Sequence, residues 1–154
     1  MTSMQVDTPK PILPFIARIY GAALPYSYAF IRVCTGAIMV PHGVQKLFYG
    51  GAASLAGTTL TAWGLPQPLV WAYGVGILQC VGGVMLALGL LTRPIALLFV
   101  IELLFILFGV TIDKGWLWTR GGSQYVVFLL GLCVAILLRG GGRYSLDRKV
   151  GKEF

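Results

Sequence analysis

Charged side chains are scarce in this sequence, because Asp, Glu, Lys and Arg together make up 11% of its 154 residues. A water-soluble domain carries roughly 25%, and a globule of this length has too much surface to cover with so few charges. Hydrophobic residues make up 57% of the chain. This composition argues against a soluble enzyme, a nucleic-acid-binding protein and a disordered chain, so we expect one integral membrane domain.

Residues that bind metals and redox cofactors are also scarce. The sequence contains one His and three Cys, and it has no CxxC, no HExxH, no paired His for haem and no glycine-rich nucleotide loop. We therefore expect no metal site. The scattered cysteines are typical of small apolar packing residues. Electrons in any redox reaction would then be held by another subunit or by a diffusible quinone.

Four apolar runs are present, at 26–47, 69–91, 94–112 and 123–138. A helix needs about 20 apolar residues to cross a bilayer, and none of the runs alternates with the period of two typical of a strand. Backbone groups in lipid must be satisfied within the segment, so each run predicts a helix, the first beginning after Pro25. Because short connections make successive helices antiparallel neighbours, we predict an all-α integral membrane four-helix bundle.

The positions of Lys and Arg predict the orientation. With both termini in the cytoplasm, eight of these residues lie inside and three outside, as the positive-inside rule requires. The membrane surface then accounts for the net charge of +7, and no nucleic-acid partner is expected. We predict a multi-pass protein of a bacterial inner membrane. Its parts are an N-terminal cytoplasmic or interfacial segment (1–25), four transmembrane helices (26–138) and a basic cytoplasmic tail (139–154).

Five short motifs occur in a specific order and spacing. They are RVCTG at 32–36, PHGVQKLF at 41–48, WGLP at 63–66, GG at 82–83 followed by LGLLTR at 88–93, and GRYSLD at 142–147. Together they resemble the DoxX family of small bacterial membrane proteins, over roughly residues 26–147. The resemblance implies a four-helix membrane fold and an association with membrane oxidoreductases, including a subunit of a thiosulfate:quinone oxidoreductase and partners in thiol and oxidative-stress defence. The family often has acidic residues where this chain has Gln79 and Gln124, so no proton-linked role carries over to those two positions.

Two charged residues are expected at membrane depth, where each is a functional hypothesis. Arg32 lies in the first span and Glu102 near the middle of the third, about 5 Å apart in depth. An ion pair between them would keep both charges in the membrane. Such a pair can fix helix register only, or Glu102 can handle a proton or a ligand. The sequence leaves both alternatives open.

Small residues on the facing sides of the first two helices predict close helix packing. In the second span a stripe of small residues surrounds Gln79, which is more often an interhelical hydrogen-bonding residue than a catalytic one. The residues assigned to this packing are Gly36, Gly76, Gln79 and Gly83.

Polar and aromatic residues gather at the expected outer ends of the helices. A quinone head group needs hydrogen-bond donors for its carbonyls and an apolar slot for its ring, and we predict a cavity for it between the first, third and fourth helices, with Asp113 as the counter-charge of Lys46. An aromatic belt with snorkelling basic residues is the alternative. The candidate ligand-binding residues are His42, Lys46, Trp63, Asp113, Trp116 and Gln124.

The leading functional hypothesis is an inner-membrane subunit of an oxidoreductase system that binds quinone or a similar amphipathic molecule. It needs a redox partner subunit, and no catalytic residue is assigned. One alternative is a carrier or channel for a small solute, with Arg32, Gln79 and Glu102 lining the path. Another is a scaffold or assembly factor without a ligand. A homo-oligomer is compatible with each of these hypotheses.

Overall fold

The computed structural model describes residues 14–151, and this part of the chain is helical, with no strand. The all-α prediction is therefore confirmed. Residues 1–13, which include more than half of the predicted N-terminal segment, and the last three residues of the predicted tail lie outside the described residues. The α-helices are α1 (Pro14–Phe48), α2 (Gly51–Leu55), α3 (Pro68–Ile77), α4 (Gly83–Leu88), α5 (Thr92–Ile106), α6 (Gln124–Arg139) and α7 (Leu146–Val150).

Short π-helical and 3₁₀ segments connect or extend these helices. The π-helical segments are η1 (Ala56–Leu60), η2 (Leu78–Gly82) and η3 (Leu107–Thr111), and the 3₁₀ segments are η4 (Ile112–Lys114) and η5 (Trp118–Arg120). Because η2 joins α3 directly to α4, these three elements form one continuous rod. An i→i+5 segment is rare, and it often occurs at functional sites.

Three helices are long and apolar enough to cross a membrane: Phe15–Phe48, Pro68–Leu88 and Thr92–Lys114. The fourth apolar helix, α6, has 16 residues and is about 24 Å long, which is shorter than the roughly 30 Å hydrocarbon core. The structure thus shows a membrane protein with three candidate spans, and a fourth crossing by α6 stays a prediction.

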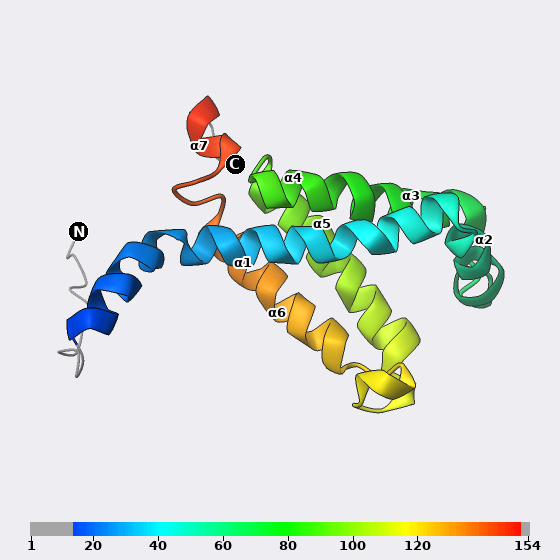
Figure 1. Cartoon of the computed structure of the whole chain (residues 1–154). Helices are drawn as coiled ribbons and strands as arrows, with labels where there is room; N and C mark the ends of the chain where they lie inside the picture. Colours follow the sequence, from blue (N-terminus) through cyan, green and yellow to red (C-terminus); the bar gives the residue numbers. More distant parts are fainter. Residues whose placement is uncertain (1–13, 152–154) are drawn as a thin grey trace.

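Helix α1 begins earlier than the sequence predicted. It starts at Pro14 and continues through both Pro25 and Pro41, so the expected start after Pro25 is wrong. A proline inside a helix removes one backbone hydrogen bond, but an apolar segment in lipid satisfies its other backbone groups best by remaining helical. With 35 residues, α1 is about 52 Å long, and its N-terminal part, coloured blue, projects beyond the other helices (Figure 1).

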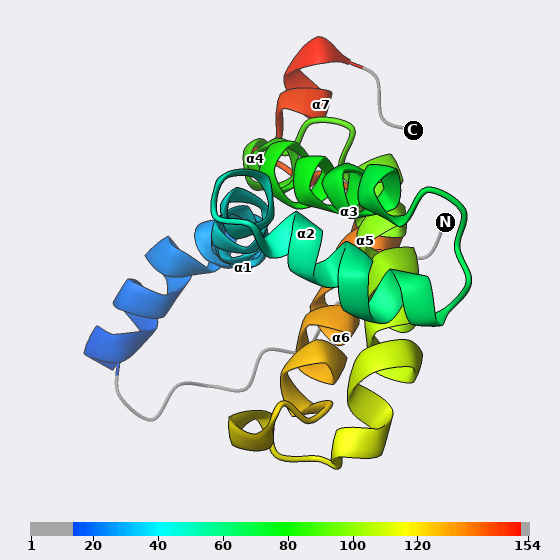
Figure 2. The same cartoon turned by 90° about the vertical axis from the view of Figure 1, so that its right-hand side faces the viewer.

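The helices form two pairs that diverge. Helix α1 runs beside the α3–α4 rod, whereas α5 runs beside α6, and the two pairs spread apart away from the α7 end (Figures 1 and 2). Glycines allow the close approach in the first pair: a Cβ atom at Gly36 would lie 2.7 Å from the backbone nitrogen of Ala87, and one at Gly43 would lie 2.7 Å from the carbonyl oxygen of Gly76. A Cβ at Gly83 would likewise meet the carbonyl oxygen of Gly36, at 2.8 Å. A closed four-helix bundle stays a prediction.

The main core lies where the two pairs meet. Its fully buried side chains come from all the long helices and include Met39, Leu86, Phe99, Leu129 and Ile136. Two of the predicted polar residues, Gln79 and Glu102, are buried as well. The packing of apolar side chains therefore fixes the helices that bring these polar residues together.

Candidate functional site

Three polar side chains from three elements form a continuous hydrogen-bonded chain. The Nζ of Lys46 on α1 donates to the Oε1 of Gln79 on η2, at 2.8 Å. The Nε2 of Gln79 in turn donates to the Oε1 of Glu102 on α5. Because an amide both accepts and donates, Gln79 connects an ammonium group to a carboxylate. We call these three residues the polar chain.

Glu102 ends the polar chain with an unused acceptor. Its side chain is 8% exposed, and that of Gln79 is 4% exposed. The Oε2 of Glu102 is buried and has no hydrogen-bond partner among the described residues. Buried polar atoms in proteins are almost always paired, and an acidic residue inside a membrane usually marks a functional site. The free oxygen is therefore a place where a hydrogen-bond donor of a ligand could bind.

Local sequence explains why the polar chain forms at this place. Gln79 lies in the π-helical segment η2, which changes the direction of its side chain relative to a regular helix. The backbone of η2 contacts Gly43, because a Cβ there would lie 2.8 Å from the Cα of Cys80. This glycine lets α1 approach η2 closely enough for Lys46, which is three residues later, to reach Gln79.

His42 lies beside the polar chain, at the edge of α1. It precedes Lys46 by one helical turn, and the Nζ of Lys46 is 3.5 Å from the carbonyl oxygen of His42. The imidazole faces the ring of Tyr125 on α6, with 6.2 Å between the ring centroids. Both side chains are exposed on the protein surface. His42 and Tyr125 thus lie between the two helix pairs, next to the polar chain.

Arg32 and Glu102 bind different partners, so the predicted ion pair between them is wrong. Arg32 is 2% exposed, and its guanidinium donates to the carbonyl oxygens of Gly141 and, at 2.9 Å, Tyr144. The segment after α6 folds back over this end of the helices and supplies these carbonyls, whereas Glu102 is bound to Gln79. The tail was expected to be a basic extension, and its contacts were missed.

The counter-charge predicted for Lys46 is also different. Asp113 lies in η4 and is exposed, whereas Lys46 is hydrogen-bonded to Gln79 and close enough to Glu102 for their charges to interact. The pairing of Lys46 with Asp113 was expected from their equal depth along the helices, which assumes that the helix axes stay close together over their whole length. Because α1 and α5 diverge (Figure 1), the C-terminal end of α5 lies away from Lys46, and the middle of α5 is the part within reach.

The six predicted ligand-binding residues do not form one site. His42 and Lys46 lie at the polar chain, whereas Trp116 is exposed and its carbonyl accepts from the backbone nitrogen of Gln124 at 3.0 Å. Asp113 and Trp116 belong to the segment between α5 and α6, coloured yellow, and Gln124 begins α6 directly after it. This segment lies apart from α2 in both views (Figures 1 and 2). Trp63 occupies a third place, next to Gly109, where a Cβ would collide with its ring.

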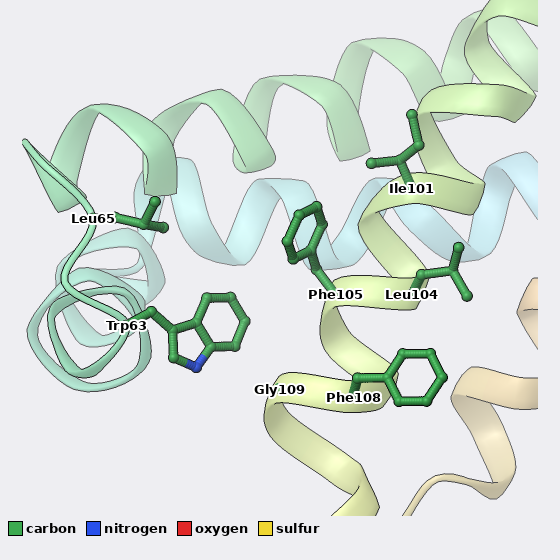
Figure 3. A pocket seen from close by; sticks show the side chains of 7 residues that line it. All are labelled: Trp63, Leu65, Ile101, Leu104, Phe105, Phe108 and Gly109. Atoms are coloured by element: carbon green, nitrogen blue, oxygen red, sulfur yellow. The ribbon is translucent and has the colours of Figure 1, made fainter.

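A groove of about 680 Å³ lies between the segment after η1 and the C-terminal half of α5 with η3 (Figure 3). This groove is not the cavity expected between the first, third and fourth helices, which stays a prediction. The rings of Trp63 and Phe105 are 6.3 Å apart across it. Its lining is apolar and consists of Trp63 and Leu65 on one side and Ile101, Leu104, Phe105, Phe108 and Gly109 on the other.

Sequence reasoning missed the central role of Gln79, although a signal for it was present. Gln79 is a lone amide in the middle of one apolar run, and Glu102 is a lone carboxylate in the middle of the next. Antiparallel neighbours place the midpoints of successive helices at the same depth, so these two side chains could have been paired. The assignment of Gln79 to a packing stripe obscured this relationship.

Comparison with known proteins identifies relatives over most of the chain. The family model described as DoxX matches residues 27–112. The uncharacterized membrane protein Rv3486 of Mycobacterium tuberculosis is 27% identical, over 91% of each chain. The putative oxidoreductase CatD of Bacillus subtilis is 29% identical, over 79% of this chain and 85% of its own length. No solved structure gives a significant match. Since the family model covers more than half of the sequence, the chain belongs to the DoxX family of membrane proteins.

Proposed function

We propose that this protein is a membrane subunit of an oxidoreductase system and that it binds quinone in its reduced, quinol form, or a similar amphipathic small molecule, at the polar chain. The observation that carries the proposal is the buried Oε2 of Glu102, which has no hydrogen-bond partner among the described residues. A carboxylate held by one oxygen, with Lys46 near its charge, offers one acceptor and nearby donors. The reduced, quinol form of a quinone has a hydroxyl hydrogen that this acceptor can bind, and a second oxygen that can accept from a donor such as Lys46.

The position of the polar chain supports a ligand that arrives from the lipid. His42 and Tyr125, which lie beside it on α1 and α6, are both exposed. The relative named as a putative oxidoreductase belongs to Bacillus subtilis, and its name is consistent with a redox role in this family. The described residues hold no cluster of three or more His, Cys, Asp or Glu side chains that could bind a metal, so we assign the electrons to the quinone and to a partner subunit.

A solute carrier is less well supported. In that hypothesis Arg32, Gln79 and Glu102 line one path. The guanidinium of Arg32 is instead buried under the carbonyls of Gly141 and Tyr144, where it holds the C-terminal segment over this end of the helices. A continuous path from Arg32 to Glu102 would require that segment to leave.

We also propose that both termini are cytoplasmic and that the membrane is the bacterial inner membrane. The 89–92 connection and the segment after α6 lie at one end of the helices, because Asp147 is hydrogen-bonded to both Leu91 and Thr92. Of the eight basic residues assigned to the inside, Arg143, Arg148 and Lys149 lie in the segment after α6, and Arg93 and Arg139 adjoin these two regions, as the positive-inside rule requires. An alkaline phosphatase reporter is active only in the periplasm, so when it is fused after Phe154 it should stay in the cytoplasm and be inactive. Phosphatase activity of this fusion would overturn the orientation.

Binding in lipid nanodiscs tests the proposed site. We expect a photoreactive benzoquinol with one isoprene unit, kept reduced, to label wild-type protein near residues 42–46 and 102. Glu102→Gln preserves the shape of the side chain but removes its charge, and it should weaken labelling about tenfold, which corresponds to the loss of one charged hydrogen bond. Asp113→Asn makes the same chemical change on an exposed carboxylate and should have no effect. Equal labelling of wild type and Glu102→Gln would contradict the proposal.

A further inference from the structure

The geometry points to the groove beside Trp63 as the binding site for the isoprenoid tail of the ligand whose head group occupies the polar chain. This inference rests on the proposed function and specifies its ligand: a quinone with a long, unsaturated, branched tail. The same two parts of the fold border the groove and the polar chain. One part runs from Trp63 through α3 to η2, and the other is α5 with η3. Helix α1 adds Lys46 to the polar chain alone.

Two contacts between these parts bracket the groove. At one end, Gln79 on η2 donates a hydrogen bond to Glu102 on α5. At the other end, the ring of Trp63 packs against Gly109 of η3. Seven residues of helix separate Glu102 from Gly109, which corresponds to about 10 Å. The groove lies along this stretch, so a molecule anchored at Glu102 has its tail directed along the groove.

The groove lies close to the polar chain along α5. Ile101, which lines the groove, is the neighbour of Glu102 in sequence, and Phe105, which also lines it, follows Glu102 by about one helical turn. The rings of Trp63 and Phe105 face the space between the segment after η1 and α5 (Figure 3). No charged side chain lines the groove. The apolar groove and the polar chain are thus adjacent along α5.

The shape of the groove favours an isoprenoid tail over a phospholipid acyl chain. Its volume of about 680 Å³ is in the range of ligand sites in proteins, roughly 300–1,000 Å³. In lipid there is no hydrophobic driving force, so selection depends on van der Waals packing and on tethering to the head group. The flat faces of Trp63 and Phe105 pack well against the planar double bonds of an isoprenoid chain, and the polar chain supplies the tether.

The experiment compares two quinones that differ only in tail length. Both benzoquinones, one with a one-unit tail and one with an eight-unit tail, are kept in the reduced quinol form. Their binding to the full chain in nanodiscs is expressed per mole of lipid, so that partitioning into the bilayer cancels. We expect the long-tailed quinone to bind wild type about tenfold more tightly. Trp63→Ala removes one wall of the groove and should abolish this preference without changing the affinity for the short-tailed quinone. Trp71→Ala, on the exposed surface of α3, is the matched control and should leave both affinities unchanged.

A second variant fills the groove instead of opening it, and a matched control places the same ring outside the groove. Ile101→Trp places a large ring in the groove and should also abolish the preference, whereas Leu97→Trp, one turn earlier on the same side of α5, should retain it. Ile101 and Leu97 are 44% and 46% exposed, so neither substitution disturbs the core.

The outcomes separate this inference from the function on which it rests. If Glu102→Gln weakens both quinones but Trp63→Ala and Ile101→Trp retain the preference for the long tail, the groove is not the tail site, although the head-group site stands. If wild type has no preference for the long tail, the groove holds lipid acyl chains and the inference is wrong. If neither quinone binds wild type, both proposals fail.

Discussion

The carboxylate of Asp147, near the C-terminus, caps the start of α5 at Thr92. Its Oδ2 accepts from the backbone nitrogen of Thr92 at 2.9 Å and from the Thr92 hydroxyl at 2.7 Å, and its Oδ1 accepts from the nitrogen of Leu91 at 2.7 Å. The backbone nitrogen of Asp147 donates to the carbonyl of Gly89 at 2.9 Å. A residue 55 positions away thus satisfies orphan donors of a helix N-terminus, and this contact fixes the C-terminal segment on the helices.

Docking of the C-terminal segment should depend on pH. Burial acts to raise the pKa of Asp147, but the hydrogen bonds from Thr92 and Leu91 and the nearby charge of Arg32 outweigh it and hold the pKa below its ordinary value. A carboxyl group whose pKa is lower in the folded state stabilises that state above its unfolded pKa and loses the effect as the pH falls through the folded one. We expect constant docking from pH 7 to about 5 and release below about pH 4.

Hydrogen exchange of the α7 amides, corrected for the intrinsic pH dependence of exchange, measures this release. Asp147→Asn should weaken docking at neutral pH by about 1–2 kcal/mol, as expected for a lost helix cap, and it should remove the pH dependence. Release of α7 in the wild type at pH 6 would contradict the role assigned to Asp147.

Arg32 and Glu102 should act independently. Their hydrogen-bond partners differ, because Arg32 donates to the carbonyls of Gly141 and Tyr144, whereas Glu102 is bound to Gln79. Arg32→Gln should cost about 3 kcal/mol in the free energy of unfolding, since it removes charged hydrogen bonds to buried carbonyls. Combined with Glu102→Gln, the two losses should add to within about 0.5 kcal/mol in detergent-induced unfolding. If the double variant were more stable than additivity predicts, Arg32 and Glu102 would form the ion pair that was predicted from the sequence.

Lys46 and Glu102 should, in contrast, be coupled through Gln79. Lys46→Met removes the donor to Gln79 and leaves Glu102 without a nearby cation, which should cost about 2 kcal/mol. The additional change Glu102→Gln removes the unbalanced carboxylate, so we expect the double variant to recover about 1 kcal/mol. Lys46→Met combined with Asp113→Asn is the control and should be additive. Coupling to Asp113 in place of Glu102 would mean that the depth-based pairing was correct.

The sequence predicted the helical class and the membrane location well, because both follow from long apolar runs that only a helix can accommodate in lipid. It predicted poorly which polar residues meet. Arg32 and Glu102 were paired by depth alone, but the choice of partner depends on long-range folding: the segment around Gly141 returns to α1 over 109 residues. The direction of Gln79 depends on a π-helical segment, for which hydrophobic periodicity gives no signal. The divergence of the helix pairs, which separates Trp116 from Lys46, likewise depends on long-range packing that the apolar runs do not encode.

Close packing of α1 on α4 should not tolerate a methyl group at Gly36. A Cβ there would lie 2.7 Å from the backbone nitrogen of Ala87 and 3.0 Å from its Cβ, and a backbone atom cannot rotate away. Gly36→Ala should therefore force the helices apart and cost about 1–3 kcal/mol in detergent-induced unfolding, as other overpacked substitutions do. It should also weaken quinone labelling, because the same helix carries Lys46 to Gln79.

Gly74 provides the matched control, because it is a helical glycine in α3 with nothing within 4 Å of the position of a Cβ. Gly74→Ala relieves the entropic cost of glycine in a helix without meeting another atom, so it should leave the protein unchanged or stabilise it by up to about 1 kcal/mol. Equal losses at Gly36 and Gly74 would mean that backbone conformation, and not contact between α1 and α4, determines the sensitivity. A loss confined to Gly36 would place the α1–α4 contact among those that hold the polar chain together.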